Sequence, residues 1–253
     1  VISNPLGEDT SVMRTTALPS ALEVIARNCN FNNDNVKIFE IATVYIPTGT
    51  DTLPEEKKVI CAAMYGNCDF YTVKGVCENI LKLADIKNAV IKSGSDNPSY
   101  HPGRYATISV NDKVIGVLGQ IHPLTAKNYG VDLPVYACEL DFEAIFALMN
   151  EAKLYTPLPK FPATTRDFSF VCDEALEFGT IKEEIAKAGG KLVDSIELFD
   201  IYRGHQVGEN KKSVSIRVTL RASDRTLTVE EAEKVSSKIL AGMEKNLGIT
   251  LRA

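Results

Sequence analysis

The chain has 253 residues, of which 45% are hydrophobic and 24% are charged, a composition typical of globular proteins that argues against disorder. No apolar run approaches the ~20 residues that a membrane-spanning helix needs. The 16 glycines and 11 prolines are scattered, which excludes a collagen-like repeat. The length predicts one or two domains. Because the sequence begins with Val1 and runs at once into motif-like sequence, we expect a fragment of a longer protein.

The cysteines and the charge exclude several kinds of site. Six cysteines form no CxxC pair and only three histidines are present, which disfavours a zinc site. A disulfide framework is also disfavoured at this size, so we expect free thiols in a reducing cytoplasm. The net charge is −5, but it is uneven: residues 1–152 carry −6, whereas residues 153–253 carry +1. A basic surface is therefore expected only in the second part.

The first part of the sequence alternates between helical and extended patterns. Apolar residues at helical spacing predict amphipathic helices near Leu18 and Val73. A short helix is expected to end near Met149. β-Branched and aromatic runs predict strands at 36–46, 57–66, 104–111, 113–121 and 134–142. This order predicts an α+β domain with a mainly antiparallel sheet.

Three prolines, at positions 157, 159 and 162, mark a boundary. Proline blocks both helix formation and ladder pairing, and it extends the residue before it. The sequence therefore predicts a short, stiff linker at 153–163. It would separate a domain of residues 1–152 from a domain of residues 164–253.

The second part has the order β-α-β-β-α-β. An alternating strand at 168–172 precedes a helix that ends at Gly189 and Gly190. The next strand, 191–203, changes its inward phase near Leu198 and Phe199, which favours a bulge. A strand at 213–221 follows, then a helix that a Thr228–Glu231 capping box begins, and a short final strand. This is the ferredoxin-like pattern, in which both helices cover one face of the sheet.

The strand at 213–221 has the strictest alternation in the chain. Its apolar side carries Val214, Ile216, Val218 and Leu220, and its polar side carries Ser213, Ser215, Arg217, Thr219 and Arg221. If the helices cover the apolar side, these arginines face solvent. A flat sheet with spaced polar side chains is a platform for nucleic acid, and Tyr202 with Arg203 would add a ring and a charge. A plain solvated strand face is the alternative.

Few other sequence motifs indicate a catalytic or binding site. GxGxxG, GxxxxGK[ST] and GxSxG are all missing from the sequence, so dinucleotide, P-loop and serine-hydrolase readings lack support. His101–Arg104 (HPGR) is either a contact for a charged ligand or, as we prefer, a Pro-Gly turn into the next strand. His122 is expected at a helix N-cap, with Pro123 in the first turn.

Several stretches resemble the C-terminal half of the bacterial phenylalanyl-tRNA synthetase β-subunit family. In the first part these are NPLGEDTSVMRTTALPSALE, FEIATVY, HPGRYATISV and IGVLGQIHP. In the second part they are PKFPATTRDFSFVCDE, ELFDIYRGHQVGENKKSV and LRASDRTLTVEE. The stretches follow one another in the family's order and cover essentially the whole chain.

This resemblance implies an α+β class II synthetase-like core without activity, followed by a ferredoxin-like domain that binds the anticodon region of tRNA(Phe). It implies the synthetase α subunit, tRNA(Phe) and a second αβ unit as partners, and neither a membrane nor DNA. ATP and magnesium belong to the whole ligase, and no cofactor or metal is expected in this fragment. Glu40 resembles a family glutamate, but Ile38 and Phe39 precede it where an active core has an arginine.

The RNA-binding role is carried over to a small set of positions. The resemblance implies Arg166, Asp167, Ser169, Tyr202, Arg203, Arg221 and Arg225, and the strand-face argument adds Arg217. Two other functions stay open at this point. Ferredoxin-like domains also sense small molecules, and a cleft near His101, Arg104 and Glu40 could serve an independent enzyme.

Overall fold

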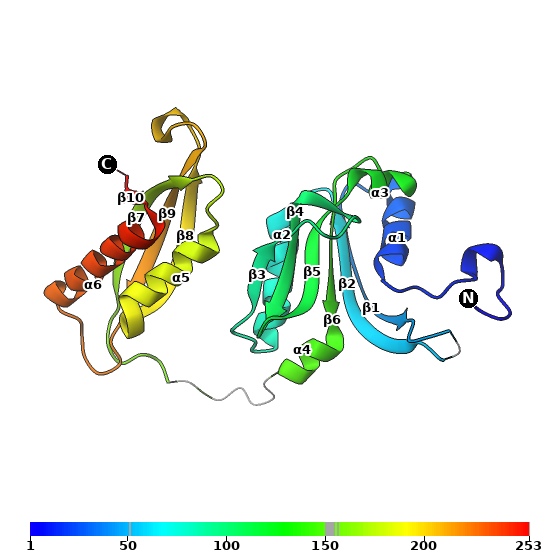
Figure 1. The fold of residues 1–253 in the computed structure, drawn as a ribbon, viewed down its shortest axis with the longest axis horizontal. Helices are drawn as coiled ribbons and strands as arrows, with labels where there is room; N and C mark the ends of the chain where they lie inside the picture. Colours follow the sequence, from blue (N-terminus) through cyan, green and yellow to red (C-terminus); the bar gives the residue numbers. More distant parts are fainter. Residues whose placement is uncertain (51, 150–154, 156, 253) are drawn as a thin grey trace. The chain divides into compact units, whose positions relative to one another are not determined.

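The computed structural model describes residues 1–50, 52–149, 155 and 157–252. Its contacts divide the chain into two compact units, Val1–Leu154 and Tyr155–Ala253, each built around its own sheet (Figure 1). Residues 153, 154 and 156 of the predicted linker lie outside the described residues. In the described part of the chain, no helix is long and apolar enough to cross a membrane.

The first unit contains a six-stranded sheet in the order β1-β2-β6-β5-β4-β3, in which all neighbours are antiparallel. This confirms the predicted mixture of helices and antiparallel strands. Its elements are the turn η1 (Glu8–Thr10), α1 (Leu18–Asn30), β1 (Val36–Ile46), β2 (Glu55–Tyr65), α2 (Phe70–Leu83), β3 (Val90–Ser93), β4 (Tyr100–Val110), β5 (Lys113–Ile121), α3 (Pro123–Asn128), β6 (Val135–Asp141) and α4 (Phe142–Leu148).

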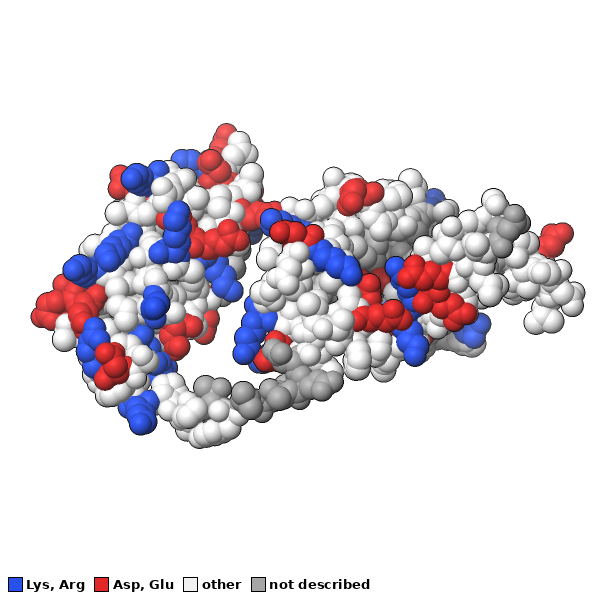
Figure 2. Space-filling view, turned by 60° about the horizontal axis from the view of Figure 1, so that its bottom comes forward, with Lys and Arg blue, Asp and Glu red and all other residues white. Residues whose placement is uncertain are grey.

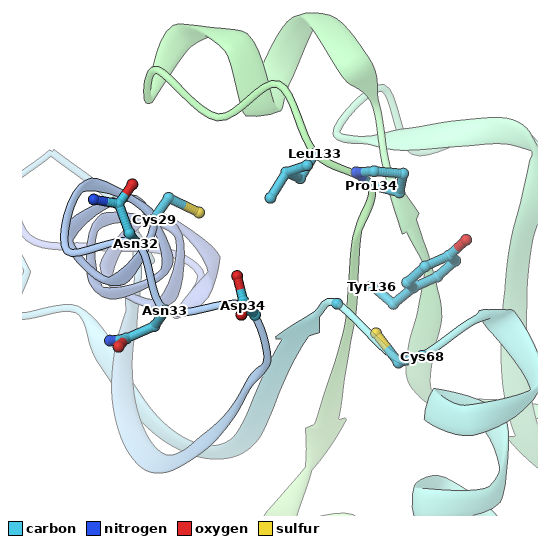
Figure 3. A pocket seen from close by; sticks show the side chains of 9 residues that line it. Cys29, Asn32, Asn33, Asp34, Cys68, Leu133, Pro134 and Tyr136 are labelled. Atoms are coloured by element: carbon cyan, nitrogen blue, oxygen red, sulfur yellow. The ribbon is translucent and has the colours of Figure 1, made fainter.

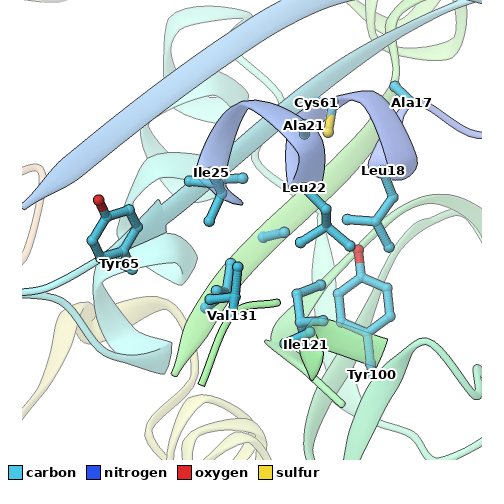
Figure 4. Packing of buried hydrophobic residues seen from close by; sticks show 14 of the residues in the cluster. Ala17, Leu18, Ala21, Leu22, Ile25, Cys61, Tyr65, Tyr100, Ile121 and Val131 are labelled. Carbon is cyan, nitrogen blue, oxygen red and sulfur yellow. The ribbon is translucent and has the colours of Figure 1, made fainter. Parts of the chain in front are cut away.

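Both faces of the central part of this sheet are covered. On one face, α1 packs Leu22 and Ile25 into a cluster with Tyr100 and Ile121 (Figure 4). On the other face, Val73 and the rest of the apolar stripe of α2 pack into a second cluster, together with residues of α4. The central strands β2, β6, β5 and β4 therefore carry apolar side chains in both directions, whereas the edge strand β1 contributes only to the first cluster and leaves Phe39 78% and Ile41 56% exposed.

The segment 101–104 differs from the predicted Pro-Gly turn. It lies inside β4, at a bulge where the pairing moves from Tyr100–Ile121 to Tyr105–Gly119. A Cβ on Gly119 would lie 2.4 Å from the carbonyl oxygen of Arg104, so only glycine leaves room for the bulged strand. The turn prediction was wrong because a bulge and a turn demand similar residues.

The second unit has the predicted ferredoxin-like order. Its elements are β7 (Thr164–Asp173), α5 (Phe178–Gly189), η2 (Gly190–Leu192), β8 (Val193–Tyr202), η3 (His205–Val207), β9 (Lys211–Leu220), α6 (Val229–Gly242), the π-helical turn η4 (Met243–Leu247) and β10 (Thr250–Leu251). The antiparallel sheet has the order β10-β7-β9-β8. Helices α5 and α6 lie side by side on one face (Figure 1). Their apolar residues share one core with alternate residues of β7 and β9.

Three local predictions in this unit are confirmed. Thr228 and Glu231 form a capping box at the start of α6. Gly190 follows α5 with φ 61°, a backbone conformation that glycine adopts without strain. The register of β8 against β9 shifts between Leu198 and Asp200, which is the expected bulge.

Candidate nucleic-acid interface

The helix-free side of the second sheet presents a polar surface, here called the open face. The register of β7, β8 and β9 fixes which side chains point to it, because facing residues of neighbouring strands share a side. These residues are Thr165, Asp167, Ser169, Val171, Asp173, Ser195, Glu197, Asp200, Tyr202, Lys211, Ser213, Ser215, Arg217 and Thr219. Val171 is the one apolar residue among these paired positions, so they offer mainly hydrogen-bonding groups.

The charge of the open face is not basic. It carries four carboxylates and two cations, a formal charge of −2. Elsewhere on the second unit, in the view that Figure 2 gives, basic and acidic residues also intermingle instead of forming one basic patch. Long-range attraction of phosphates to this face is therefore weak.

Arg217 is the central cation of the face, and it is paired. It faces Asp167 directly across β9 and β7. Its Nε donates to Asp167 Oδ1 at 2.8 Å and its Nη2 donates to Asp167 Oδ2 at 2.7 Å. These hydrogen bonds lower the pKa of Asp167 and raise the pKa of Arg217. Arg217 therefore lies on the solvent-facing side, as the alternation predicts, and its guanidinium already holds a carboxylate.

Tyr202 and Arg203 lie at the end of β8. Tyr202 faces Ser213, and the guanidinium carbon of Arg252 lies 5.0 Å from the centre of the tyrosine ring. Arg203 is paired with Glu174, with Nε donating to Oε1 at 2.9 Å, and this bond lowers the pKa of Glu174. One face of the ring and the charge of the arginine are thus both engaged within the unit.

Arg221 and Arg225 also have carboxylate partners. Arg221 follows the last residue of β9; it donates to Asp194 at 3.1 Å and to the carbonyl oxygen of Phe161 at 3.0 Å. Arg225 donates to Asp224 at 3.0 Å and to Glu231 at 2.7 Å. The second pair attaches Arg225 to the capping box of α6. Both arginines therefore hold structural positions in addition to any role with RNA.

Arg166 and Ser169 lie on opposite sides of the same strand. Ser169 is on the open face, where its hydroxyl lies 2.9 Å from that of Ser215. Arg166 faces Val218, whose side chain is in the core, so Arg166 belongs to the helix-covered side. The structure therefore brings together Asp167, Ser169, Tyr202 and Arg217 and leaves Arg166 on the other side of the sheet.

The open face also holds residues that were not selected from the sequence. Asp200 faces Ser215, and Glu197 faces Arg217. Ser213 is 1% exposed, and its hydroxyl has no hydrogen-bond partner in the described part of the chain. Phe199, in the bulge, is 55% exposed. The alternation of 213–221 gave a signal for Ser213, and the predicted bulge gave one for Phe199.

The candidate residues of the first unit form hydrogen bonds with other residues of that unit. Glu40 accepts from Arg14 Nη2 at 2.8 Å, so a guanidinium does lie beside Glu40, although it comes from outside the strand. The same arginine donates to the carbonyl of Thr43 and to Ser20, both at 3.0 Å. Its Nε and both of its Nη atoms therefore each have a partner within the unit.

The histidines and Arg104 of the first unit have local partners too. His122 caps α3 by accepting from the backbone N–H of Leu124, as predicted. His101 accepts from the N–H of Gly103 within the bulge. Arg104 Nη1 donates to the buried Gln120 at 2.6 Å. These contacts account for the shape of the bulge and the start of α3.

A cleft of about 430 Å³ in the first unit collects none of the predicted residues. It lies between the end of α1, the segment before α2 and the segment before β6 (Figure 3). Cys29, Cys68, Asp34, Leu133 and Tyr136 are among its lining residues. Among the residues that the structure describes, no cluster of three or more His, Cys, Asp or Glu could hold a metal ion.

The chain matches two protein-family models, one in each unit. Residues 159–252 match the model of the ferredoxin-fold anticodon binding domain, which puts the second unit in the class of anticodon-binding modules. Residues 1–142 match the phenylalanyl tRNA synthetase beta chain CLM domain. The chain therefore belongs to the phenylalanyl-tRNA synthetase β-chain family.

Individual proteins agree with this assignment. The chain is 42% identical over 252 residues to the phenylalanine–tRNA ligase beta subunit of Clostridium acetobutylicum, and 32% identical over 264 residues to that of Bacillus subtilis. The matches cover 99% and 100% of this chain but 32% and 33% of those proteins, so the chain spans about a third of their length. A pyrrolysyl tRNA synthetase structure from Desulfitobacterium hafniense overlaps with a TM-score of 0.47 at 13% identity over 57% of this chain and 52% of that one, which supports no conclusion.

Proposed function

We propose that this chain is the noncatalytic part of a phenylalanine–tRNA ligase β subunit that supports the catalytic α subunit and binds the anticodon region of tRNA(Phe). The observation that carries the proposal is the open face of the second unit, which lies within the segment matching an anticodon-binding domain. Such a ligase works in the cytoplasm, uses ATP and magnesium, and assembles from two αβ units.

The composition of the open face supports contacts to bases more than contacts to phosphates. Its arginine is paired and its formal charge is −2, so few phosphates can be neutralised. Serine, threonine, aspartate and tyrosine can donate to or accept from the edges of unpaired bases, and aromatic rings can stack on them. We therefore expect RNA binding with a shallow dependence on salt.

Binding of tRNA(Phe) transcript to the 253-residue chain tests this function. A filter-binding titration should show binding that is lost when the anticodon loop is replaced. The slope of log K against log salt should be smaller in magnitude than about 2, which corresponds to roughly two or three phosphate contacts. A steep slope with no dependence on the anticodon would point to nonspecific attraction and contradict the proposal.

The supporting role has a separate test. In cells that produce the full-length β subunit, a separately encoded α subunit should co-purify with it. ATP–pyrophosphate exchange dependent on phenylalanine should be absent from the 253-residue chain alone, because Arg14 is engaged with Glu40, Thr43 and Ser20. Exchange in a preparation free of α subunit would overturn the noncatalytic assignment.

The two domains and the linker at 153–163 form part of the same proposal. Prolines at 157, 159 and 162 limit hydrogen bonding between the units. Each unit has its own apolar core, which supports independent folding. A chain of residues 160–253 should show the circular dichroism of a folded α+β protein. An unfolded spectrum, with the 253-residue chain folded, would place the boundary elsewhere.

A further inference from the structure

The bulge in β8 places an exposed aromatic ring next to the central ion pair of the open face. The guanidinium carbon of Arg217 lies 5.5 Å from the centre of the Phe199 ring, within the range of a cation–π contact. Because Arg217 points to the open face, this contact places Phe199 there as well. The extra residue of the bulge thus turns an aromatic side chain towards the open face.

The guanidinium beside the ring is held in place. Both of its hydrogen bonds to Asp167 are shorter than 2.9 Å and arranged as a bidentate pair. The three side chains, Phe199, Arg217 and Asp167, therefore form a row across β8, β9 and β7 that we call the stacking row. Its ion pair carries no net charge, so the row neither attracts nor repels a phosphate strongly.

Phe199 is more accessible than the tyrosine that the sequence pointed to. It is 55% exposed, compared with 36% for Tyr202, although each ring already has one arginine beside it, Arg217 at Phe199 and Arg252 at Tyr202. When a flat apolar surface covers an exposed aromatic ring, apolar area is removed from water and the free energy falls. A nucleobase supplies such a surface, since every base has a π-face that stacks on aromatic side chains.

We propose that Phe199 is a stacking residue for an unpaired base of the bound tRNA. Arg217 contacts the ring, and Asp167 holds Arg217 in place. This rests on the proposed function and adds a contact to it. The base uses the solvent-exposed part of the ring, and the guanidinium keeps its hydrogen bonds to Asp167. No phosphate contact is involved, so the contribution of this stacking is independent of salt.

A tryptophan reporter tests the proposal directly, because the chain contains no tryptophan. In Phe199→Trp, titration with tRNA(Phe) transcript should quench the emission of the new indole, since a base stacked on it lies in contact. The matched control is Phe31→Trp in the first unit, a position that is also exposed, at 75%. Its emission should stay constant during the same titration.

Affinity gives the second readout. Phe199→Leu should weaken binding about fivefold or more at every salt concentration, with an unchanged salt slope, in line with the alanine-scan values for base–aromatic stacking. Phe199→Trp should bind like the unsubstituted chain, and Phe31→Leu should also leave the affinity unchanged. A circular dichroism melt verifies that each variant is folded.

The outcomes separate the two proposals. Constant emission from Trp at position 199, or unchanged affinity of Phe199→Leu, while the unsubstituted chain binds tRNA, would overturn the stacking role and leave the proposed function intact. A lower affinity with a flatter salt slope would also overturn it, because the lost contact would then be electrostatic. Failure of the unsubstituted chain to bind tRNA(Phe) transcript would overturn both.

Discussion

The two sheets of this protein differ in how many of their faces are covered. The first lies between two apolar clusters, one under α1 and one under α2 and α4. The second has a single cluster under α5 and α6, and its other face is polar. Strands that are covered on both sides, as the central strands of the first sheet are, can support other elements but offer no face to a ligand. A sheet covered on one side keeps a flat surface whose side chains do not decide its stability.

Loss of a large core side chain should affect the second unit most, because it has only one core. Phe170 is fully buried there, so Phe170→Ala should destabilise the unit by about 3–5 kcal/mol. Hydrogen exchange should show faster exchange throughout β7, β8 and β9, with protection in the first unit unchanged. If the loss of protection is confined to β7, the single-core description is wrong.

The corresponding change in the first unit should have a more local effect. Leu22 of α1 is 1% exposed, and Leu22→Ala should cost about 2–5 kcal/mol. Because α2 packs on the opposite face of the sheet, the amides of α2 should keep more protection than those of α1. Equal loss in both helices would show that the two faces unfold as one.

A change at the start of α6 should have a smaller effect. Thr228 accepts from the N–H of Glu231, and the Glu231 side chain accepts from the N–H of Thr228. Thr228→Ala should therefore cost about 1 kcal/mol in a urea titration. Thr165→Ala on the open face is the matched control, and its free energy of unfolding should change by less than about 0.5 kcal/mol.

The smallest expected effect concerns the ion pair on the open face. Arg217 holds the pKa of Asp167 below its usual value, chiefly through its hydrogen bonds. Since the folded-state pKa is depressed, the pair stabilises the fold above the ordinary pKa of an aspartate, and this contribution is lost as the pH falls through the folded-state pKa. In Arg217→Ala, carboxyl NMR should show the pKa of Asp167 rising towards its ordinary value. An unchanged pKa would mean that the pair does not persist in solution.

Most of the second unit could be predicted from sequence because each element had a local signal. Alternation, the capping box and the Gly189-Gly190 stop each depend on neighbours in the chain. The position of Arg166 could also have been predicted. It precedes Phe168 by two residues, and the alternation that puts Phe168 in the core puts Arg166 on the same side.

The partners of the arginines could not be predicted in the same way. The contact between Arg217 and Asp167 joins residues 50 positions apart, and it depends on the register of β7 against β9. The pair of Arg14 and Glu40 depends on how the segment before α1 runs beside β1. Neither the register nor the path of the segment before α1 is encoded in the residues next to each arginine, so the sequence predicted no partner for either one.

The cross-strand pairs of the open face also constrain how related sequences can diverge. Asp167 and Arg217 face each other directly, as do Ser169 and Ser215. A single charge reversal at position 167 would place two cations side by side, whereas a reciprocal exchange of the two residues would keep the pair. In an alignment of the family, positions 167 and 217 should therefore covary, and position 119, where a Cβ would meet the backbone of Arg104, should stay glycine whatever its neighbours become.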